Sequence, residues 1–178
     1  MKDIVRTKEK ESGALYAKEF GVKNVMAHPR LVKVVVSVGT GRADKKKKEF
    51  IAERISRITG QHAVPRMAKK SIATYKTRTG DSIGVMVTLR GAQMYSFLDK
   101  LIHIALPRTR DFKGVSPKSI DKEGNLTMGI TEHTIFPETA EDDVRDAFGL
   151  AVTFVSTAKN KKEAHLFFQT IGVPFREV

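Results

Sequence analysis

The clearest pattern in the chain is the alternation of side chains over residues 31–38, which are rich in β-branched types and predict a strand. A period of two places four valines on one face: Val32, Val34, Val36 and Val38. The opposite face is partly polar and carries Leu31, Lys33, Val35 and Ser37. The pattern therefore predicts a sheet with one face in the core and a second face that serves as a working surface.

Two helices are predicted in the first third of the chain. Residues 8–20 favour a short helix that stops at Gly21. A second helix is expected to start after a cap at Asp44 and to end at Gly60. Its apolar side is formed by Phe50, Ile51, Ile55 and Ile58.

Two more helices are predicted further along. A strongly apolar helix begins at Gly91 and stops at Pro107, and we expect its His103 to be a core residue. The last helix has a start that resembles a capping box at Asn160, and it ends at Gly172.

The remaining strands are expected in a hairpin and near the C-terminus. The hairpin has arms at 63–75 and 83–90 and a tip near 79–82. A further strand is predicted over 150–157. Residues 107–148 look irregular and contain turn signals, and a stretch of this kind is usually functional or built from short elements.

Strands separated by helices, with one hairpin, predict an α+β fold. We expect a single domain over residues 1–178, with a mainly antiparallel sheet, helices packed on one face and a long basic hairpin loop. A polar set on the strands would point away from the helices: Lys33, Ser37, Thr88, Arg90 and Thr153.

The net charge of +12 is unevenly distributed. Residues 1–90 hold 21 Lys and Arg against 8 Asp and Glu, a balance of +13, whereas residues 91–178 hold 11 against 12, a balance of −1. A basic half beside a neutral half indicates a charged face, with nucleic acid as the leading polyanion. An anionic membrane is a weaker candidate, because no long helix combines a basic face with a bulky apolar one.

The basic side chains concentrate between Glu53 and Asp81, where the chain has no acidic residue. Within the hairpin they alternate with hydroxyl groups and one aromatic ring, which suits a phosphate backbone with nearby bases. The candidate contacts are Arg66, Lys69, Lys70, Thr74, Tyr75, Lys76 and Arg78.

Other chemistry has weak support. The Gly39-Thr40-Gly41 turn lacks the third small residue of a dinucleotide loop and the context of a Walker loop. Without cysteine the chain has no disulfide or thiolate chemistry, and its five histidines lack metal-ligand spacing, so we expect no catalytic residue, metal or cofactor. The lysine run 45–48 is either a solvated helix face or a phosphate contact at a helix start.

Two further charged segments have alternative interpretations. Arg108 and Arg110 follow a helix end in what we expect to be an extended path, so both guanidinium groups would point to one side and suit a phosphate or carboxylate pair. Asp111 could instead pair with one of them and fix the loop. An acidic cluster is either a solvated surface or a contact for a basic partner: Glu138, Glu141, Asp142, Asp143 and Asp146.

Several ordered segments resemble the family of ribosomal protein five of the bacterial large subunit. They are Val25-Met26-Ala27-His28-Pro29-Arg30, residues 69–84, Thr88-Leu89-Arg90-Gly91, Leu106-Pro107-Arg108-Thr109-Arg110-Asp111-Phe112-Lys113-Gly114, residues 129–138, Thr157-Ala158-Lys159 and Pro174-Phe175. The similarity runs in order from about residue 20 to the C-terminus.

The resemblance implies a non-enzymatic protein of the cytoplasmic large ribosomal subunit. Such a protein would bind 5S rRNA, attach it to 23S rRNA in the central protuberance, contact neighbouring 5S-binding ribosomal proteins, and touch P-site tRNA and small-subunit ribosomal protein thirteen. The tRNA contact would lie around residues 70–81 and the subunit bridge within 107–146. The implied 5S contacts are Arg30, Lys33, Ser37, Arg66, Thr88 and Arg90.

Two rival functions stay open at the level of sequence. One is an RNA-modifying or RNA-cleaving enzyme that uses the carboxylates of 138–146 with a metal. The other is a general basic RNA chaperone, which would bind 5S rRNA and unrelated RNAs equally well.

Overall fold

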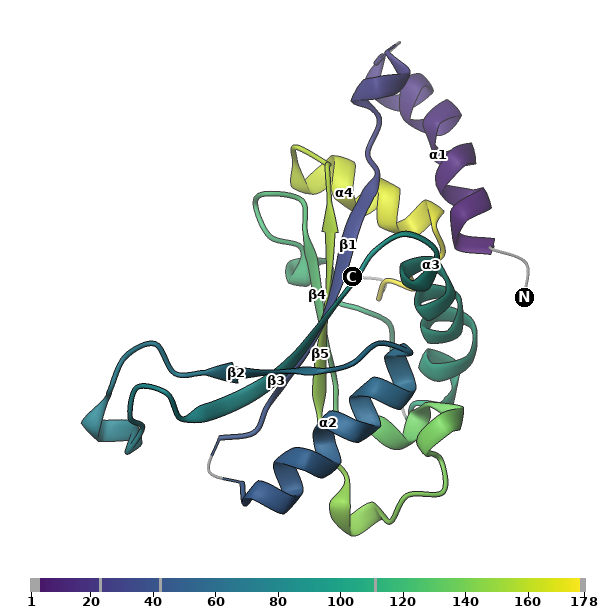
Figure 1. Cartoon of the computed structure of the whole chain (residues 1–178). Helices are drawn as coiled ribbons and strands as arrows, with labels where there is room; N and C mark the ends of the chain where they lie inside the picture. The colour runs from purple at the N-terminus through teal and green to yellow at the C-terminus, as the bar shows by residue number, and fades with distance from the viewer. Residues whose placement is uncertain (1–3, 23, 42, 111, 177–178) are drawn as a thin grey trace.

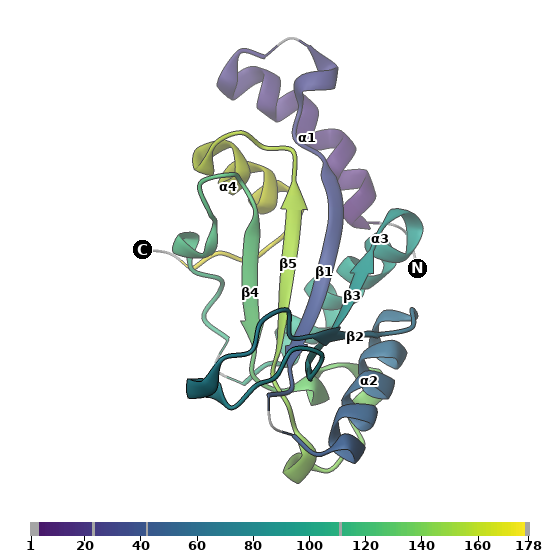
Figure 2. The same ribbon diagram turned by 60° about the vertical axis from the view of Figure 1, so that its left-hand side comes forward.

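The fold is organised around one antiparallel sheet of five strands in the order β2-β3-β1-β5-β4. The computed structural model describes residues 4–22, 24–41, 43–110 and 112–176. The strands are β1 (Leu31–Gly39), β2 (Val64–Met67), β3 (Ser82–Leu89), β4 (Leu126–Ile130) and β5 (Leu150–Ser156). The long strand β1 lies in the centre, and the β2–β3 hairpin projects from one side of the molecule (Figures 1 and 2).

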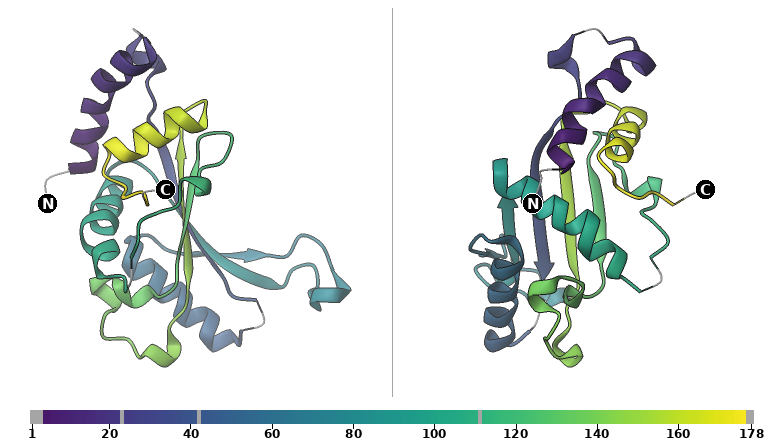
Figure 3. Two further views of the ribbon diagram at one scale, coloured as in Figure 1. Left: turned by 180° about the vertical axis from the view of Figure 1, so that it is seen from behind. Right: turned by 90° about the vertical axis from the view of Figure 1, so that its right-hand side faces the viewer.

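Within the described residues four α-helices lie on the same side of this sheet (Figure 3). They are α1 (Ile4–Phe20), α2 (Lys45–Thr59), α3 (Gly91–Lys100) and α4 (Lys161–Thr170), and α1 packs against α3 and α4. Alternate strand residues such as Val34, Val36, Val87 and Val152 are buried under the helices. The expected α+β architecture, with helices on one face, is therefore confirmed.

The register at the start of β1 differs from the prediction. A bulge lies between Leu31 and Lys33, where the pairing with β5 shifts. As a result Leu31 is buried and Val32 is 44% exposed, the reverse of what a strict period of two predicts. From Lys33 onward the alternation follows the prediction.

Helix ends and phases account for two further differences. Gly60 ends α2 in the left-handed conformation, as expected, but Asp44 makes no side-chain capping bond although it occupies the cap position. After α3 the chain continues as a π-helix over Leu101–Ala105. This wider turn changes the phase of the side chains, so His103 is exposed and the prediction that it is a core residue is wrong.

The sequence prediction missed β4 and misplaced the hairpin tip. In β4 the buried Leu126, Met128 and Ile130 alternate with exposed residues, a signal that the surrounding turn residues obscured. In the hairpin, a backbone bridge joins Ile72 to Thr77 and places the tip at residues 73–76, instead of 79–82.

Two carboxylates help to fix helix α1 to the rest of the fold, beside the buried side chains of Val5 and Tyr16. The helix has no acidic residue in its own first turn, and the buried Asp99 of α3 accepts hydrogen bonds from the backbone N–H groups of Ile4 (3.2 Å) and Val5 (2.9 Å). Glu9 accepts from the Leu31 N–H at 2.9 Å and from the Tyr95 hydroxyl at 2.6 Å. Burial and the neighbouring Glu9 carboxylate raise the pKa of Tyr95, so its hydroxyl stays protonated and able to donate.

We therefore predict that Asp99→Ala lowers the free energy of unfolding by about 1–3 kcal/mol, because two N–H groups lose their acceptor in a buried site. Asp99→Asn keeps one acceptor oxygen and should lose less. Urea unfolding measures both changes, and hydrogen exchange should show the loss of protection concentrated in α1. An alanine variant as stable as the wild type would contradict the capping role.

Candidate nucleic-acid interface

The face of the sheet opposite the helices carries short, mostly neutral side chains in ordered rows. One row joins Thr88, Val35, Thr153 and Thr127 across four strands, and the hydroxyl groups of Thr127 and Thr153 lie 3.1 Å apart. A second row carries Val64, Met86, Ser37, Ala151 and Gly129. These rows form the open face, which offers hydroxyl groups between small apolar contacts.

Cations mark the two ends of the open face. At one end, Lys33 follows the bulge of β1. Arg90 lies at the same end, because it directly follows Leu89, which pairs with Val34. The backbone of Arg90 is extended, so the alternation of β3 continues and directs this side chain to the open face. At the other end Arg66 pairs with Gly84. None of the five strands contains Asp or Glu, so the positive potential of these side chains is not offset within the sheet.

The segment that joins β2 to β3, residues 68–81, extends away from the sheet (Figure 1) and carries further basic residues. Backbone hydrogen bonds fix both its base and its tip. At the base the Ala68 N–H donates to the Asp81 carbonyl at 2.8 Å, and at the tip the Ile72 N–H donates to the Thr77 carbonyl at 3.0 Å. The tip turns through Lys76, which adopts a left-handed φ of 51°. The predicted contacts in this segment are all exposed: Lys69, Lys70, Thr74, Tyr75, Lys76 and Arg78.

Arg30 lies outside the open face, immediately before β1. Its backbone is paired with Thr157 through an N–H bond to the threonine hydroxyl at 2.9 Å and a carbonyl that accepts from the Thr157 N–H at 3.0 Å. The side chain is exposed, and its guanidinium lies 3.7 Å from the sulfur of Met26. Arg30 is thus at the β1 start, the same end of the sheet as Lys33.

Arg108 and Arg110 come together, although the expected path is wrong in detail. Arg108 ends a short 3-10 helix (Leu106–Arg108), and the chain becomes extended only at Thr109. Both arginines are exposed and line one cavity of about 310 Å³ with Glu132. The alternative pairing of Asp111 lies outside the described residues.

The acidic cluster of residues 138–146 is partly used inside the fold. Asp142 forms an ion pair with Arg54 of α2 at 2.6 Å, and Glu138 forms one with Lys100. Glu141, Asp143 and Asp146 remain exposed. The cluster is therefore divided between anchoring its own loop and presenting carboxylates at the surface.

His133 completes the anchor of this loop. It is fully buried, and its ring stacks on the Phe148 ring with 4.1 Å between the ring centroids. Its Nδ1 atom accepts a long hydrogen bond of 3.4 Å from the Phe148 backbone N–H. Its proton then belongs on Nε2, which lies 3.2 Å from the Asp142 carboxylate. Burial lowers the pKa of His133, and the Arg54 charge acts in the same direction, while Asp142 opposes them.

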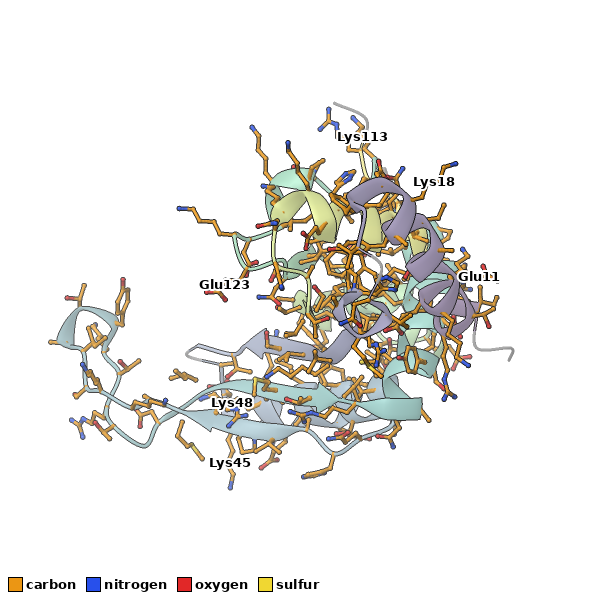
Figure 4. The ribbon with its side chains drawn as sticks, turned by 90° about the horizontal axis from the view of Figure 1, so that it is seen from above. Glu11, Lys18, Lys45, Lys48, Lys113 and Glu123 are labelled. Atoms are coloured by element: carbon orange, nitrogen blue, oxygen red, sulfur yellow. The ribbon has the colours of Figure 1, made fainter. Side chains whose placement is uncertain are left out.

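The lysine run at the start of α2 reaches the hairpin through Lys48. The Lys48 ammonium, labelled in Figure 4, donates to the Ser82 carbonyl at 2.7 Å. Lys45, Lys46 and Lys47 are exposed. The Lys45 Nζ lies 3.9 Å from Oε1 of Glu49. Because both side chains are exposed, this ion pair contributes little to stability.

Over the described ranges, no group of three or more His, Asp and Glu side chains is arranged to hold a metal ion. In the same ranges, no helix combines the length and the apolar character needed to cross a membrane. The residues that sequence reasoning missed are the neutral members of the open face, such as Ala151 and Gly129, and the Arg54–Asp142–His133 anchor. Strand alternation could have indicated the first group, whereas the second depends on contacts between distant segments.

Comparisons with known proteins match almost the whole chain to ribosomal proteins. Residues 24–78 match the family described as ribosomal protein L5, and residues 82–175 match the C-terminal part of the same ribosomal family. A large ribosomal subunit protein uL5 of Heliobacterium modesticaldum is 50% identical over 97% of this chain and 99% of its own length. A protein of the same name from Anaeromyxobacter sp. (strain Fw109-5) is 49% identical over 95% of this chain and 95% of its own length. Another, from Ureaplasma parvum serovar 3, is 47% identical over 100% of this chain and 96% of its own length.

The buried histidine yields a prediction about pH. Because the pKa of His133 is lower in the folded state, the unfolded chain binds the proton more readily, and acidification below the ordinary histidine pKa of about 6.5 favours unfolding. Between pH 7 and 5 the unfolding free energy should fall with a slope of up to about 1.4 kcal/mol per pH unit. In His133→Gln the slope should be clearly smaller, and equal slopes in denaturant titrations would contradict this account.

Proposed function

Because the chain belongs to the ribosomal L5 family and is a structural constituent of the large ribosomal subunit, we propose that it binds 5S rRNA and attaches it to 23S rRNA in the central protuberance. The open face of the sheet and its ends form the 5S contact in this proposal. The residues assigned to it are Arg30, Lys33, Ser37, Arg66, Thr88 and Arg90.

One observation carries the proposal: the open face has cations at both ends and no carboxylate on any of its strands. A polyanion can approach such a face without repulsion from the strands themselves. The threonine hydroxyls and Ser37 can exchange hydrogen bonds with the 2′-hydroxyl groups and base edges of a shallow RNA surface. The small side chains between them allow close approach.

The mechanism is positioning without chemistry. Lys and Arg side chains neutralise phosphates and release counterions, so affinity falls with salt by a log–log slope of about −0.7 to −0.9 per phosphate. The hydroxyl groups then select among RNAs by shape. A general RNA chaperone lacks this second step and would not distinguish 5S rRNA from other RNAs of similar length.

The projecting segment 68–81 is proposed to contact P-site tRNA. It projects away from the rest of the fold (Figure 1) and presents exposed cations on a backbone that hydrogen bonds hold at both base and tip. A pre-formed loop loses less conformational entropy on binding than a disordered one. The low entropy cost of binding is consistent with a loop that contacts the tRNA from one side.

Residues 107–146 are proposed to form the bridge to small-subunit ribosomal protein thirteen and to face neighbouring 5S-binding proteins. Exposed carboxylates at Glu141, Asp143 and Asp146 suit a basic partner, while Arg108 and Arg110 suit phosphate or carboxylate groups. The Arg54–Asp142 ion pair holds this loop on α2 and limits the entropy lost on docking.

Charge reversal of the loop tests the tRNA assignment. We predict that replacing Lys69, Lys70 and Lys76 by Glu weakens P-site tRNA binding to reconstituted ribosomes by about tenfold or more at moderate salt, because several phosphate contacts are lost. The thermal unfolding midpoint should stay unchanged, since all three side chains are exposed.

The matched control reverses three exposed lysines of the helix layer, Lys18, Lys161 and Lys162, which changes the net charge equally. It should leave tRNA binding near the wild-type value. Equal effects of the two triple variants would remove the loop from the site.

A single substitution tests the 5S contact. Arg90→Ala should weaken binding of the free protein to 5S rRNA by about tenfold, the scale of one lost charge-assisted hydrogen bond. Arg57→Ala removes an exposed arginine of α2 and serves as the control, with an expected change below about twofold. Filter binding at physiological salt measures both, and an unchanged Arg90→Ala affinity would exclude this residue from the contact.

A further inference from the structure

An exposed apolar groove lies where the segment 68–81 joins the body of the protein. Its volume is about 640 Å³, and its floor is formed by Ala68, Ile72, Tyr75 and Ile83. Three of these side chains are large and substantially exposed: Ile72 by 44%, Tyr75 by 65% and Ile83 by 38%. An apolar patch of this kind next to many charges is a typical feature of an interaction site.

The groove exists because the core side of β3 continues beyond the helix layer. Val85 and Val87 are buried under the helices, and Ile83 has the same orientation two residues earlier. Helix α2 starts beside this point, where Lys48 binds the Ser82 carbonyl, and the hairpin continues past it (Figures 1 and 4). Ile83 therefore lies on the core side of β3 but stays partly exposed, since no helix buries it.

The shape of the groove is fixed by backbone bonds. Two bonds of 3.0 and 3.3 Å join Ile72 and Thr77, and they hold the tip that carries Tyr75. Ala68 at the base is bonded to both Gly80 and Asp81. The apolar floor is therefore pre-formed, and an occupant does not have to order the loop first.

The charges around the groove favour an anionic occupant. Lys69 and Lys70 contribute to its lining, and no acidic residue does. Over residues 68–81 there are four basic residues and one acidic residue, a balance of +3. That acidic residue, Asp81, already accepts a bond of 2.7 Å from the Arg78 N–H.

We propose that this groove accepts a single unstacked nucleobase from an RNA loop, with the adjoining phosphate neutralised by Lys69 and Lys70. The inference rests on the proposed function, since it refines how the 68–81 segment holds RNA. Bases splayed out of single-stranded loops stack on aromatic and apolar side chains, and any base offers a suitable face. The groove adds an apolar contact to a surface otherwise described by charge.

The test measures how strongly the groove side chain and the base depend on each other. The full-length protein is titrated with a fluorescein-labelled single-stranded oligouridine and with the same backbone lacking its bases, and fluorescence anisotropy gives the affinities. Ile72→Ser removes the apolar side chain while its backbone bonds remain. Leu15→Ser is the control, because Leu15 of α1 is 51% exposed and does not line the groove.

For the wild type, loss of the bases should weaken binding by about tenfold, within the range for one stacked base. Ile72→Ser should weaken binding to oligouridine by about tenfold as well, and it should bind the abasic backbone like the wild type. Leu15→Ser should behave as the wild type on both. With 4-thiouridine in the RNA, ultraviolet crosslinks should map to residues 68–83, and Ile72→Ser should reduce them.

Two results would overturn the proposal. If Ile72→Ser matched Leu15→Ser on both RNAs, the groove would hold no base. If Ile72→Ser weakened binding to both RNAs equally, the side chain would act independently of the base, and an apolar side chain of a protein partner would become the better occupant. Failure of the proposed function is distinguishable, because reversal of Lys69, Lys70 and Lys76 would then leave binding to both RNAs unchanged.

Discussion

Everything in this fold depends on a sheet that is buried on one face and uncovered on the other. The period of two along each strand places valine, leucine and isoleucine side chains under the helices and leaves small polar side chains outside. The apolar burial on one side stabilises the fold, so the opposite side is free of that requirement. A working surface can then be specified by residues such as Lys33, Ser37 and Thr88 with little effect on the core.

The helices also divide the charges of the molecule. Carboxylates are concentrated in helices and loops, where several serve internal contacts: Asp99 and Glu9 fix α1, and Asp142 fixes the 131–148 loop through Arg54 and His133. The strands contain cations but no Asp or Glu. A structural constituent of the ribosome benefits from this division, because the acidic groups that stabilise the fold lie in other elements than those proposed to meet RNA.

Sequence reasoning worked where a local signal determined the structure. The alternation in β1, the glycine end of α2 and the orientation of the polar strand residues follow from neighbouring residues alone. It failed at the bulge before Lys33, at the π-turn that exposes His103 and at β4, where the conformation depends on pairing with distant strands or on packing. The Arg54–Asp142 anchor was missed for the same reason, since its partners are far apart in the chain.

The most direct measurement of the central claim is a selection experiment with the purified chain and total cellular RNA at moderate ionic strength. If the open face and its cations recognise a folded ribosomal RNA, the recovered RNA should be strongly enriched in 5S rRNA, and the enrichment should persist when salt reduces total binding. Recovery of RNAs in proportion to their abundance, or of no ribosomal RNA at all, would contradict the account.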